Sequence, residues 1–184
     1  MAMTSPLRVG IAGLGTVGGG VARLLHQNAE LIEKRCGKKI DIIAASAKDQ
    51  SEMSALPLKN AKWVADATQL PDENVDVVVE LVGGSEGIAR KLVEAALGKG
   101  TPVVTANKAL LAHHGKALAE MAEQSGAVLA FEAAVAGGIP IIKAMRESLS
   151  ANRFTRVMGI LNGTCNYILT EMQARKCSFD DALK

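Results

Sequence analysis

The sequence of 184 residues is long enough for one domain, or for one domain and the start of a second. Its formal net charge of +2 is small and its basic residues are scattered, which argues against a nucleic-acid-binding surface. Hydrophobic residues make up 48% of the chain but aromatic residues only 3%, so the core must be aliphatic. Such a core suits a parallel sheet with helices on both faces.

The cysteines and the apolar runs indicate where the protein resides. Cys36, Cys165 and Cys177 form no CxxC pair, which is typical of reduced thiols. Residues Met1 to Arg8 lack the apolar stretch of a signal peptide, and no later run approaches the ~20 apolar residues of a membrane span. We therefore expect a cytoplasmic protein without a membrane partner.

The first half of the chain alternates strand and helix patterns. Apolar residues recur at three- and four-residue steps after the first glycines, which predicts a helix that Gly37 ends. The run VDVVVELV does not alternate with polar residues, as expected of a strand buried on both faces. The expected elements are a strand at Leu7 to Ala12, a helix from Thr16 to about Arg35, a strand at Ile40 to Ala45, an irregular stretch, and a strand at Val75 to Val82.

The second half continues the alternation up to about Ser150. The expected elements are helices at Glu86 to Leu97 and Lys108 to Ser125, strands at Pro102 to Thr105 and Ala127 to Phe131, and a helix that opens at Pro140. This βαβ pattern predicts an α/β fold with a Rossmann-type, doubly wound parallel sheet over residues 1–150. Residues 151–184 change register, with a strand at Phe154 to Leu161 and a helix at Cys165 to Ala174. We expect residues 151–184 to be the incomplete start of an α+β substrate-binding and dimerisation domain.

A glycine motif follows the first strand and opens the first helix. In Rossmann folds the first glycine permits the tight turn, the second lets the backbone approach a pyrophosphate, and the third lets helix and strand pack closely. The helix N-terminus supplies amide hydrogens to the phosphates. The alternative is a glycine-rich turn without a ligand; a P-loop is excluded because no GK[ST] follows. The motif comprises Gly13, Leu14, Gly15, Thr16, Val17 and Gly18.

The end of the second strand bears on the choice of cofactor. An acid there selects NAD by binding the ribose 2′-hydroxyl. From Ala44 onward the sequence has no acid until Asp49, while Ser46 and Lys48 are suited to a 2′-phosphate. The pattern favours NADP over NAD, with an ordinary loop lysine as the alternative role of Lys48.

Several segments together resemble the homoserine dehydrogenase family across essentially the whole chain. They are GLGTVG at Gly13 to Gly18, ELVGG at Glu80 to Gly84, TANKALL at Thr105 to Leu111, EAAVAGGIPII at Glu132 to Ile142, and LNGTCNYIL at Leu161 to Leu169. The last two are the most specific. Aspartate-semialdehyde dehydrogenase is disfavoured, because no cysteine has a setting suited to a nucleophile.

The resemblance implies hydride transfer between NAD(P)H and L-aspartate 4-semialdehyde, giving L-homoserine, in threonine and methionine biosynthesis. It implies that Gly83, Gly84 and Thr105 lie at the cofactor. It also implies that Lys108 reaches the nicotinamide and the substrate carbonyl, where a cation would stabilise the developing alkoxide. Without the resemblance, Lys108 would be an ordinary surface lysine at a helix N-terminus.

The resemblance further implies a monovalent cation, such as sodium, held by Glu132 and the carbonyls of Val135, Gly137 and Ile139. The alternative is that Glu132 caps the helix at Pro140. Asn162, Gly163 and Thr164 resemble the loop that brings the substrate domain to the nicotinamide, and Thr164 also suits a helix N-cap. The adjacent His113 and His114 point about 100° apart on a helix, so they cannot clasp a metal together.

In that family, the residues that bind the substrate amino group and hydroxyl, and the acid–base lysine, follow the segment matched here. We therefore expect this chain to bind cofactor but to have little or no dehydrogenase activity alone. An apolar face near Ile160 and Ile168 predicts a homo-oligomer. The alternative functions are a non-catalytic dinucleotide-binding regulatory module and another Rossmann enzyme that acts on an aldehyde or amino acid.

Overall fold

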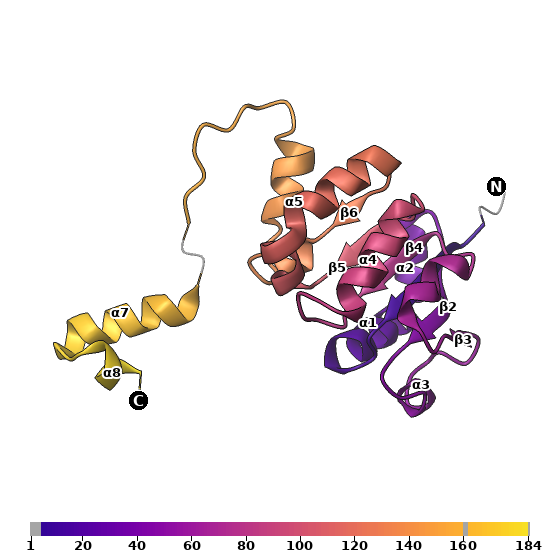
Figure 1. Ribbon diagram of the computed structural model, residues 1–184, viewed down its shortest axis with the longest axis horizontal. Helices are drawn as coiled ribbons and strands as arrows, with labels where there is room; N and C mark the ends of the chain where they lie inside the picture. Colours follow the sequence, from indigo (N-terminus) through magenta and orange to yellow (C-terminus); the bar gives the residue numbers. More distant parts are fainter. Residues whose placement is uncertain (1–4, 160–161, 184) are drawn as a thin grey trace. The chain divides into compact units, whose positions relative to one another are not determined.

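The computed structural model describes residues 5–159 and 162–183, which form two compact units (Figure 1). The first unit ends at Ile142 and the second begins at Lys143. The assignment of residues 1–150 to a cofactor domain and 151–184 to a substrate domain remains a prediction. Within the described residues, no helix is both long enough and apolar enough to cross a membrane.

The first unit is built on a six-stranded sheet in which every neighbouring pair is parallel. The strand order is β3-β2-β1-β4-β5-β6, so the chain winds outward from β1 in one direction and outward from β4 in the other. This order confirms the predicted doubly wound sheet of the Rossmann type. The strands are β1 (Leu7–Ala12), β2 (Ile40–Ser46), β3 (Lys62–Trp63), β4 (Val77–Glu80), β5 (Val103–Thr105) and β6 (Leu129–Ala130).

Helices connect the strands and make up the regular structure of the second unit. Those up to residue 142 are α1 (Thr16–Gln27), α2 (Ala29–Cys36), α3 (Ser51–Ser54), the 3₁₀ helix η1 (Ala67–Asp72), α4 (Ile88–Gly98), α5 (Lys108–Ser125) and the 3₁₀ turn η2 (Glu132–Ala134). Helix α6 (Ile141–Lys143) spans the boundary between the units. The second unit contains the π-helical turn η3 (Ala144–Ser148), α7 (Gly163–Arg175) and α8 (Phe179–Ala182).

Two aliphatic clusters lie on the two faces of the sheet. On one face Val78 and Val103 pack with α4, α5 and η1, and α4 packs against both α5 and η1. Figure 1 shows α4 and α5 next to each other. On the other face Ile11 and Ala45 pack with α1 and with the segment after α3. This second layer does not extend over the whole sheet, since Val104 of β5 is 40% exposed.

The strand register aligns one residue from each of four strands at the carboxyl edge of the sheet. Ala12 pairs with Ser46 on one side and with Glu80 on the other, and Glu80 pairs with Thr105. The segments that follow these residues therefore start from the same edge. In open α/β sheets, this edge is where ligands bind.

Two predicted elements differ from the structure by more than the position of their ends. The first long helix is interrupted at Asn28, whose side-chain amide donates a hydrogen bond to the carbonyl of Leu24 (3.1 Å). Such local bonding by asparagine competes with helix continuation. The strand predicted from Phe154 is absent through Gly159, where Val157 and Met158 are 66% and 81% exposed and no described strand is available for pairing.

An ion pair fastens the amino ends of β1 and β4. The Arg8 guanidinium donates to both carboxylate oxygens of Asp76 (2.7 and 3.1 Å), and the Arg8 backbone amide donates to the same carboxylate (2.8 Å). These hydrogen bonds lower the pKa of Asp76 to about 2. The carboxylate therefore stabilises the fold above its ordinary pKa, and this contribution is lost as the pH falls from about 4 towards 2.

Replacing Asp76 with Asn should lower the free energy of unfolding at pH 7 by about 1 kcal/mol, a value reduced for screening of the partly exposed pair. Urea unfolding at pH 7 and at pH 2.5 measures the effect, which should shrink at the lower pH. Asp72→Asn, which removes the exposed partner of Lys99, is the control and should cost less than about 0.5 kcal/mol. An equal loss at both pH values would contradict the assignment to the Asp76 carboxylate.

Candidate active site

Two glycines of the turn after β1 are required by the fold itself. Gly13 has φ +88°, and a β-carbon on it would lie 2.6 Å from the carbonyl oxygen of Leu81. A β-carbon on Gly18 would lie 1.8 Å from the carbonyl oxygen of Gly13. No side chain fits at these distances, so Gly13 and Gly18 allow α1 to start directly against the end of β1.

Gly15 differs from Gly13 and Gly18, because a β-carbon on it would meet no atom within 4 Å. It occupies the N-cap position of α1, where no side chain accepts a hydrogen bond from the first turn, and this turn carries no acidic residue. The first turn of α1 therefore has no side-chain cap and the space beside Gly15 is open, as a phosphate site requires. A turn without a ligand would need Gly13 and Gly18 but not Gly15.

The other residues of the turn divide between the core and the surface. Leu14 is buried at 5% exposure and packs with the cluster under α1. Thr16 and Val17 are exposed, and Val17 presents 57% of its surface. An apolar side chain this open at the first turn of a helix suits a site that a ligand covers.

The segment after β2 carries an exposed lysine and an acid that is hydrogen-bonded locally. The Ser46 residue is buried at 3% exposure and its carbonyl accepts a hydrogen bond from the amide of Gly13 (2.8 Å), whereas Lys48 is exposed. Asp49 is engaged locally, since it accepts a hydrogen bond from the amide of Ser51 (2.8 Å), and this bond lowers the pKa of its carboxyl. Of the two residues predicted to bind a 2′-phosphate, Lys48 is the accessible one.

A buried carboxylate organises the segment that follows β4. Glu80 is fully buried, and its Oε1 accepts hydrogen bonds from the amides of Val82 (2.8 Å) and Gly83 (3.1 Å). Its Oε2 accepts a hydrogen bond from the hydroxyl of Thr105 (2.6 Å). Glu80 was not among the residues predicted to form the site, although the one acid near the end of an otherwise apolar strand was the available signal.

The start of α5 is tied to the same segment. The Asn107 side-chain oxygen accepts a hydrogen bond from the amide of Leu110 (3.0 Å) and so caps the helix, while its side-chain nitrogen donates to the carbonyl of Gly84 (2.7 Å). Lys108 is the first helical residue and is exposed. The Thr105 hydroxyl also accepts a hydrogen bond from the Asn107 amide (3.0 Å) and is fully buried, so it acts within the protein.

One of the two histidines of α5 contacts a carboxylate. His114 Nε2 lies 2.5 Å from the carboxylate of Glu86, which also accepts a hydrogen bond from Arg90 (3.1 Å). The contact with His114, followed by that with Arg90, lowers the pKa of Glu86. No group of three or more His, Cys, Asp or Glu side chains suited to a metal occurs in the described parts of the chain.

The structure tests the capping role of Glu132. Its carboxylate accepts a hydrogen bond from the amide of Ile142 (3.1 Å), in the helix that follows Pro140. Ala136, Gly137 and Gly138 all have positive φ values (55°, 46° and 74°), so the intervening loop is tightly curled. The predicted helix-capping alternative is therefore observed.

The second unit shows which residue caps its first helix. Asn162 occupies the N-cap of α7, and its side-chain oxygen accepts hydrogen bonds from the amides of Thr164 (2.8 Å) and Cys165 (3.2 Å). The cap predicted at Thr164 is therefore two residues too late. Ile168, predicted to lie on an exposed apolar face, is buried at 8% exposure, and Ile160 and Leu161 lie outside the described residues.

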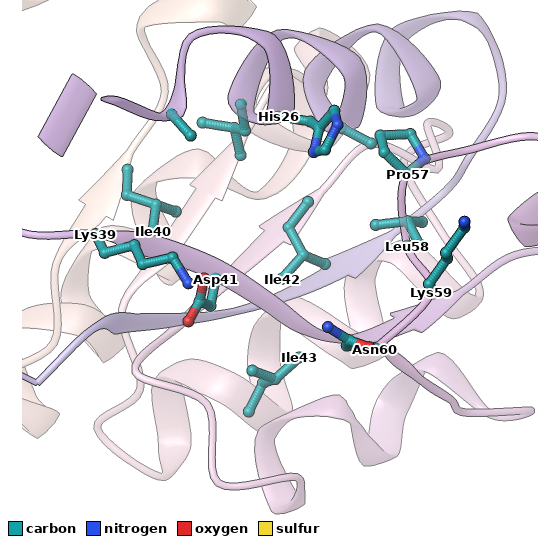
Figure 2. A pocket seen from close by; sticks show the side chains of 13 residues that line it. His26, Lys39, Ile40, Asp41, Ile42, Ile43, Pro57, Leu58, Lys59 and Asn60 are labelled. Atoms are coloured by element: carbon teal, nitrogen blue, oxygen red, sulfur yellow. Dashed lines mark ion pairs between the residues drawn. The ribbon is translucent and has the colours of Figure 1, made fainter. Parts of the chain in front are cut away.

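A cavity of about 510 Å³ lies away from the glycine turn. It borders the first half of β2, with Lys39 and Asp41 on one side and Lys59 and Asn60 on the other (Figure 2). The residues from Ile40 to Ile42 pair with the amino-terminal half of β1, whereas the glycine turn follows its carboxyl end. This cavity is therefore distinct from the carboxyl-edge site.

An open helix N-terminus at the carboxyl edge of a doubly wound parallel sheet defines a dinucleotide-binding domain of the Rossmann type. Comparison with known protein families shows to which of them the chain belongs. The family described as "Homoserine dehydrogenase, NAD binding domain" matches residues 13–132, and that described as "Homoserine dehydrogenase" matches residues 140–184. The chain belongs to the homoserine dehydrogenase family, and its first unit is a nicotinamide-dinucleotide-binding domain.

Known proteins support this assignment and show how much of the family's length is represented. A homoserine dehydrogenase from Neisseria gonorrhoeae is 49% identical over 97% of this chain, which covers 41% of that relative. The crystal structure of a homoserine dehydrogenase from Thiobacillus denitrificans is 46% identical, with a TM-score of 0.81 over 97% of this chain and 41% of that one. A hyperthermophilic archaeal homoserine dehydrogenase in complex with NADPH shares the fold at 23% identity (TM-score 0.74, 97% of this chain and 59% of that one).

The open space at Gly15 gives a test that separates binding from folding. Gly15→Ala should leave the protein folded, because Gly15 has negative φ and its β-carbon would meet nothing. It should weaken dinucleotide binding at least about tenfold by blocking the phosphates, as measured by calorimetry.

Gly20→Ala is the matched control. It adds a β-carbon to open space in the same helix and should leave binding unchanged. Unaltered affinity of the Gly15→Ala variant would place the phosphates elsewhere.

Proposed function

We propose that this chain is the cofactor-binding portion of an enzyme that interconverts L-aspartate 4-semialdehyde and L-homoserine. The observation that carries the proposal is the uncapped N-terminus of α1, with open space at Gly15, in a chain of this family. The bound nicotinamide would supply the hydride. Because the chain spans about 41% of the relatives that it matches, further residues of such an enzyme would complete the substrate site.

Each segment at the carboxyl edge has a proposed task. The α1 amide hydrogens bind the pyrophosphate, and Leu14, Thr16 and Val17 line the turn. The segment with Gly83 and Gly84 supports the nicotinamide half of the cofactor. Lys108, exposed at the start of α5, places its ammonium where charge develops on the substrate oxygen.

NADP is the proposed preferred cofactor. In favour of it are the exposed Lys48 after β2 and the hydrogen bond that Asp49 accepts from Ser51, which competes with a ribose 2′-hydroxyl for that carboxylate. The buried Ser46 would contribute less than Lys48.

Lys48→Ala should weaken NADPH binding about five-fold and leave NADH binding unchanged, because a lysine pairs with the phosphate that only NADPH carries. Calorimetric titration with both cofactors measures this, and wild-type protein should bind NADPH more tightly. Lys34→Ala, an exposed lysine of α2, is the control. Equal weakening of both cofactors in Lys48→Ala would refute the role.

The loop after β6 is the proposed site of a monovalent cation such as sodium. Glu132 and the carbonyls of Val135, Gly137 and Ile139 form an oxygen-only donor set, which suits a hard cation. The tight curl at Ala136 to Gly138 supports this by turning the backbone over a short span. Capping of the helix through Ile142 is compatible with it, since a carboxylate accepts several bonds.

The segment Asn162, Gly163 and Thr164 is proposed to contact the substrate. Its exposed position at the N-terminus of α7 is consistent with that task. Self-association of the enzyme is also proposed, although the burial of Ile168 removes one of the two residues on which that expectation was based.

A chimaera tests the activity. If these 184 residues replace the matching segment of the Neisseria relative, the product should oxidise NADPH with L-aspartate 4-semialdehyde at a rate within about tenfold of the parent, or about 1.4 kcal/mol in barrier. The 184-residue chain alone is the reference and should show little or no turnover. A folded chimaera that binds NADPH but does not react would contradict the proposal.

A further inference from the structure

We propose that Glu80 is a positioning residue that sets the nicotinamide half of the cofactor site. It does so by fixing the segment with Gly83 and Gly84 and, through Thr105, the start of the helix that carries Lys108. This inference rests on the proposed function and names a buried group on which the geometry of that site depends.

The complete burial of the Glu80 side chain supports a positioning role. A carboxylate removed from water costs free energy unless hydrogen bonds replace its hydration, and apolar residues are often as good or better for the fold at such positions. Glu80 is fully buried at the end of β4, and the hydrogen bonds that it accepts come from neutral groups of Val82, Gly83 and Thr105. Its carboxylate thus acts on the local conformation of the chain.

The hydrogen bonds that Glu80 accepts form a network with two arms, one through each carboxylate oxygen. The first arm holds the segment after β4. Two successive amides, those of Val82 and Gly83, converge on one oxygen of Glu80. Gly83 and Gly84 then adopt φ values of +85° and +83°, and a β-carbon on Gly83 would meet no atom within 4 Å. The carboxylate therefore holds an open glycine turn at the carboxyl edge of the sheet.

The second arm reaches α5. Thr105 donates its hydroxyl hydrogen to Glu80 and accepts from the amide of Asn107, so its orientation is fixed at both ends. Asn107 in turn caps α5 and donates to the carbonyl of Gly84. Both arms end at Asn107, which bonds to Thr105 and to Gly84. Lys108 is the next residue in the chain.

The strand order indicates which half of the cofactor depends on this network. In this fold the ribose of the adenine half lies at the end of β2 and the pyrophosphate at the turn after β1. The sheet continues from β1 to β4 and β5, so the nicotinamide half extends towards Glu80 and Thr105. Loss of the network should therefore weaken binding of the nicotinamide half and spare the adenine half.

The test compares NADPH with ADP-ribose 2′-phosphate, which has the adenine half and both bridging phosphates but no nicotinamide. Glu80→Gln keeps an acceptor for the two amides but reverses the polarity at Thr105. Thr105→Val removes the hydroxyl at nearly constant shape and serves if the first variant does not fold. In either variant we expect NADPH to bind about tenfold more weakly and the fragment to change less than about twofold.

Val93→Ala is the control for lost stability, since it removes two methyl groups from a fully buried side chain of α4 outside the network. It should leave the ratio of the two dissociation constants unchanged. Equal weakening of both ligands, or no change for either in a folded variant, would overturn the role of Glu80. Failure of wild-type protein to bind either ligand would instead overturn the proposed function.

Discussion

Among the glycines of the described residues, Gly18 has the least room for a side chain, because a β-carbon on it would lie 1.8 Å from the carbonyl oxygen of Gly13. This close packing lets α1 begin at the end of β1, with its N-terminus at the carboxyl edge of the sheet. The first-turn amides of α1 then lack a side-chain cap, and Gly15 keeps the space before them open. The binding of an anionic cofactor depends on this arrangement, because the unpaired amides carry partial positive charge.

The strand register places the ends of four strands at the same edge of the sheet as the N-terminus of α1. Because Ala12, Ser46, Glu80 and Thr105 lie in one row, the segments proposed to bind the adenine ribose, the pyrophosphate and the nicotinamide start at one level. Glu80 and Thr105, the last pair of the β4–β5 ladder, are also joined by a side-chain hydrogen bond. The edge is consequently held by polar contacts, while the aliphatic clusters hold the two faces.

The fold of the first unit was predictable because its signals are local. Unbroken apolar runs marked the buried strands, and the helix at Lys108–Ser125 was predicted with the bounds that the structure has. The short β3 was missed, since two residues give no periodic pattern. The break at Asn28 and the absent strand at Phe154 depend on a single side-chain bond and on the lack of a pairing strand, neither of which periodicity reports.

The candidate site was predictable in part for the same reason. The glycine turn has a fixed spacing, but Glu80 and Asn107 act through partners 25 and 23 residues away, which only the folded chain brings together. The most direct test of the account is to follow backbone amide resonances during titration with ADP-ribose 2′-phosphate. The largest changes in amide chemical shift should occur at Gly15, Thr16 and Val17. Largest shifts at Lys39 to Ile43, beside the cavity of Figure 2, would contradict it.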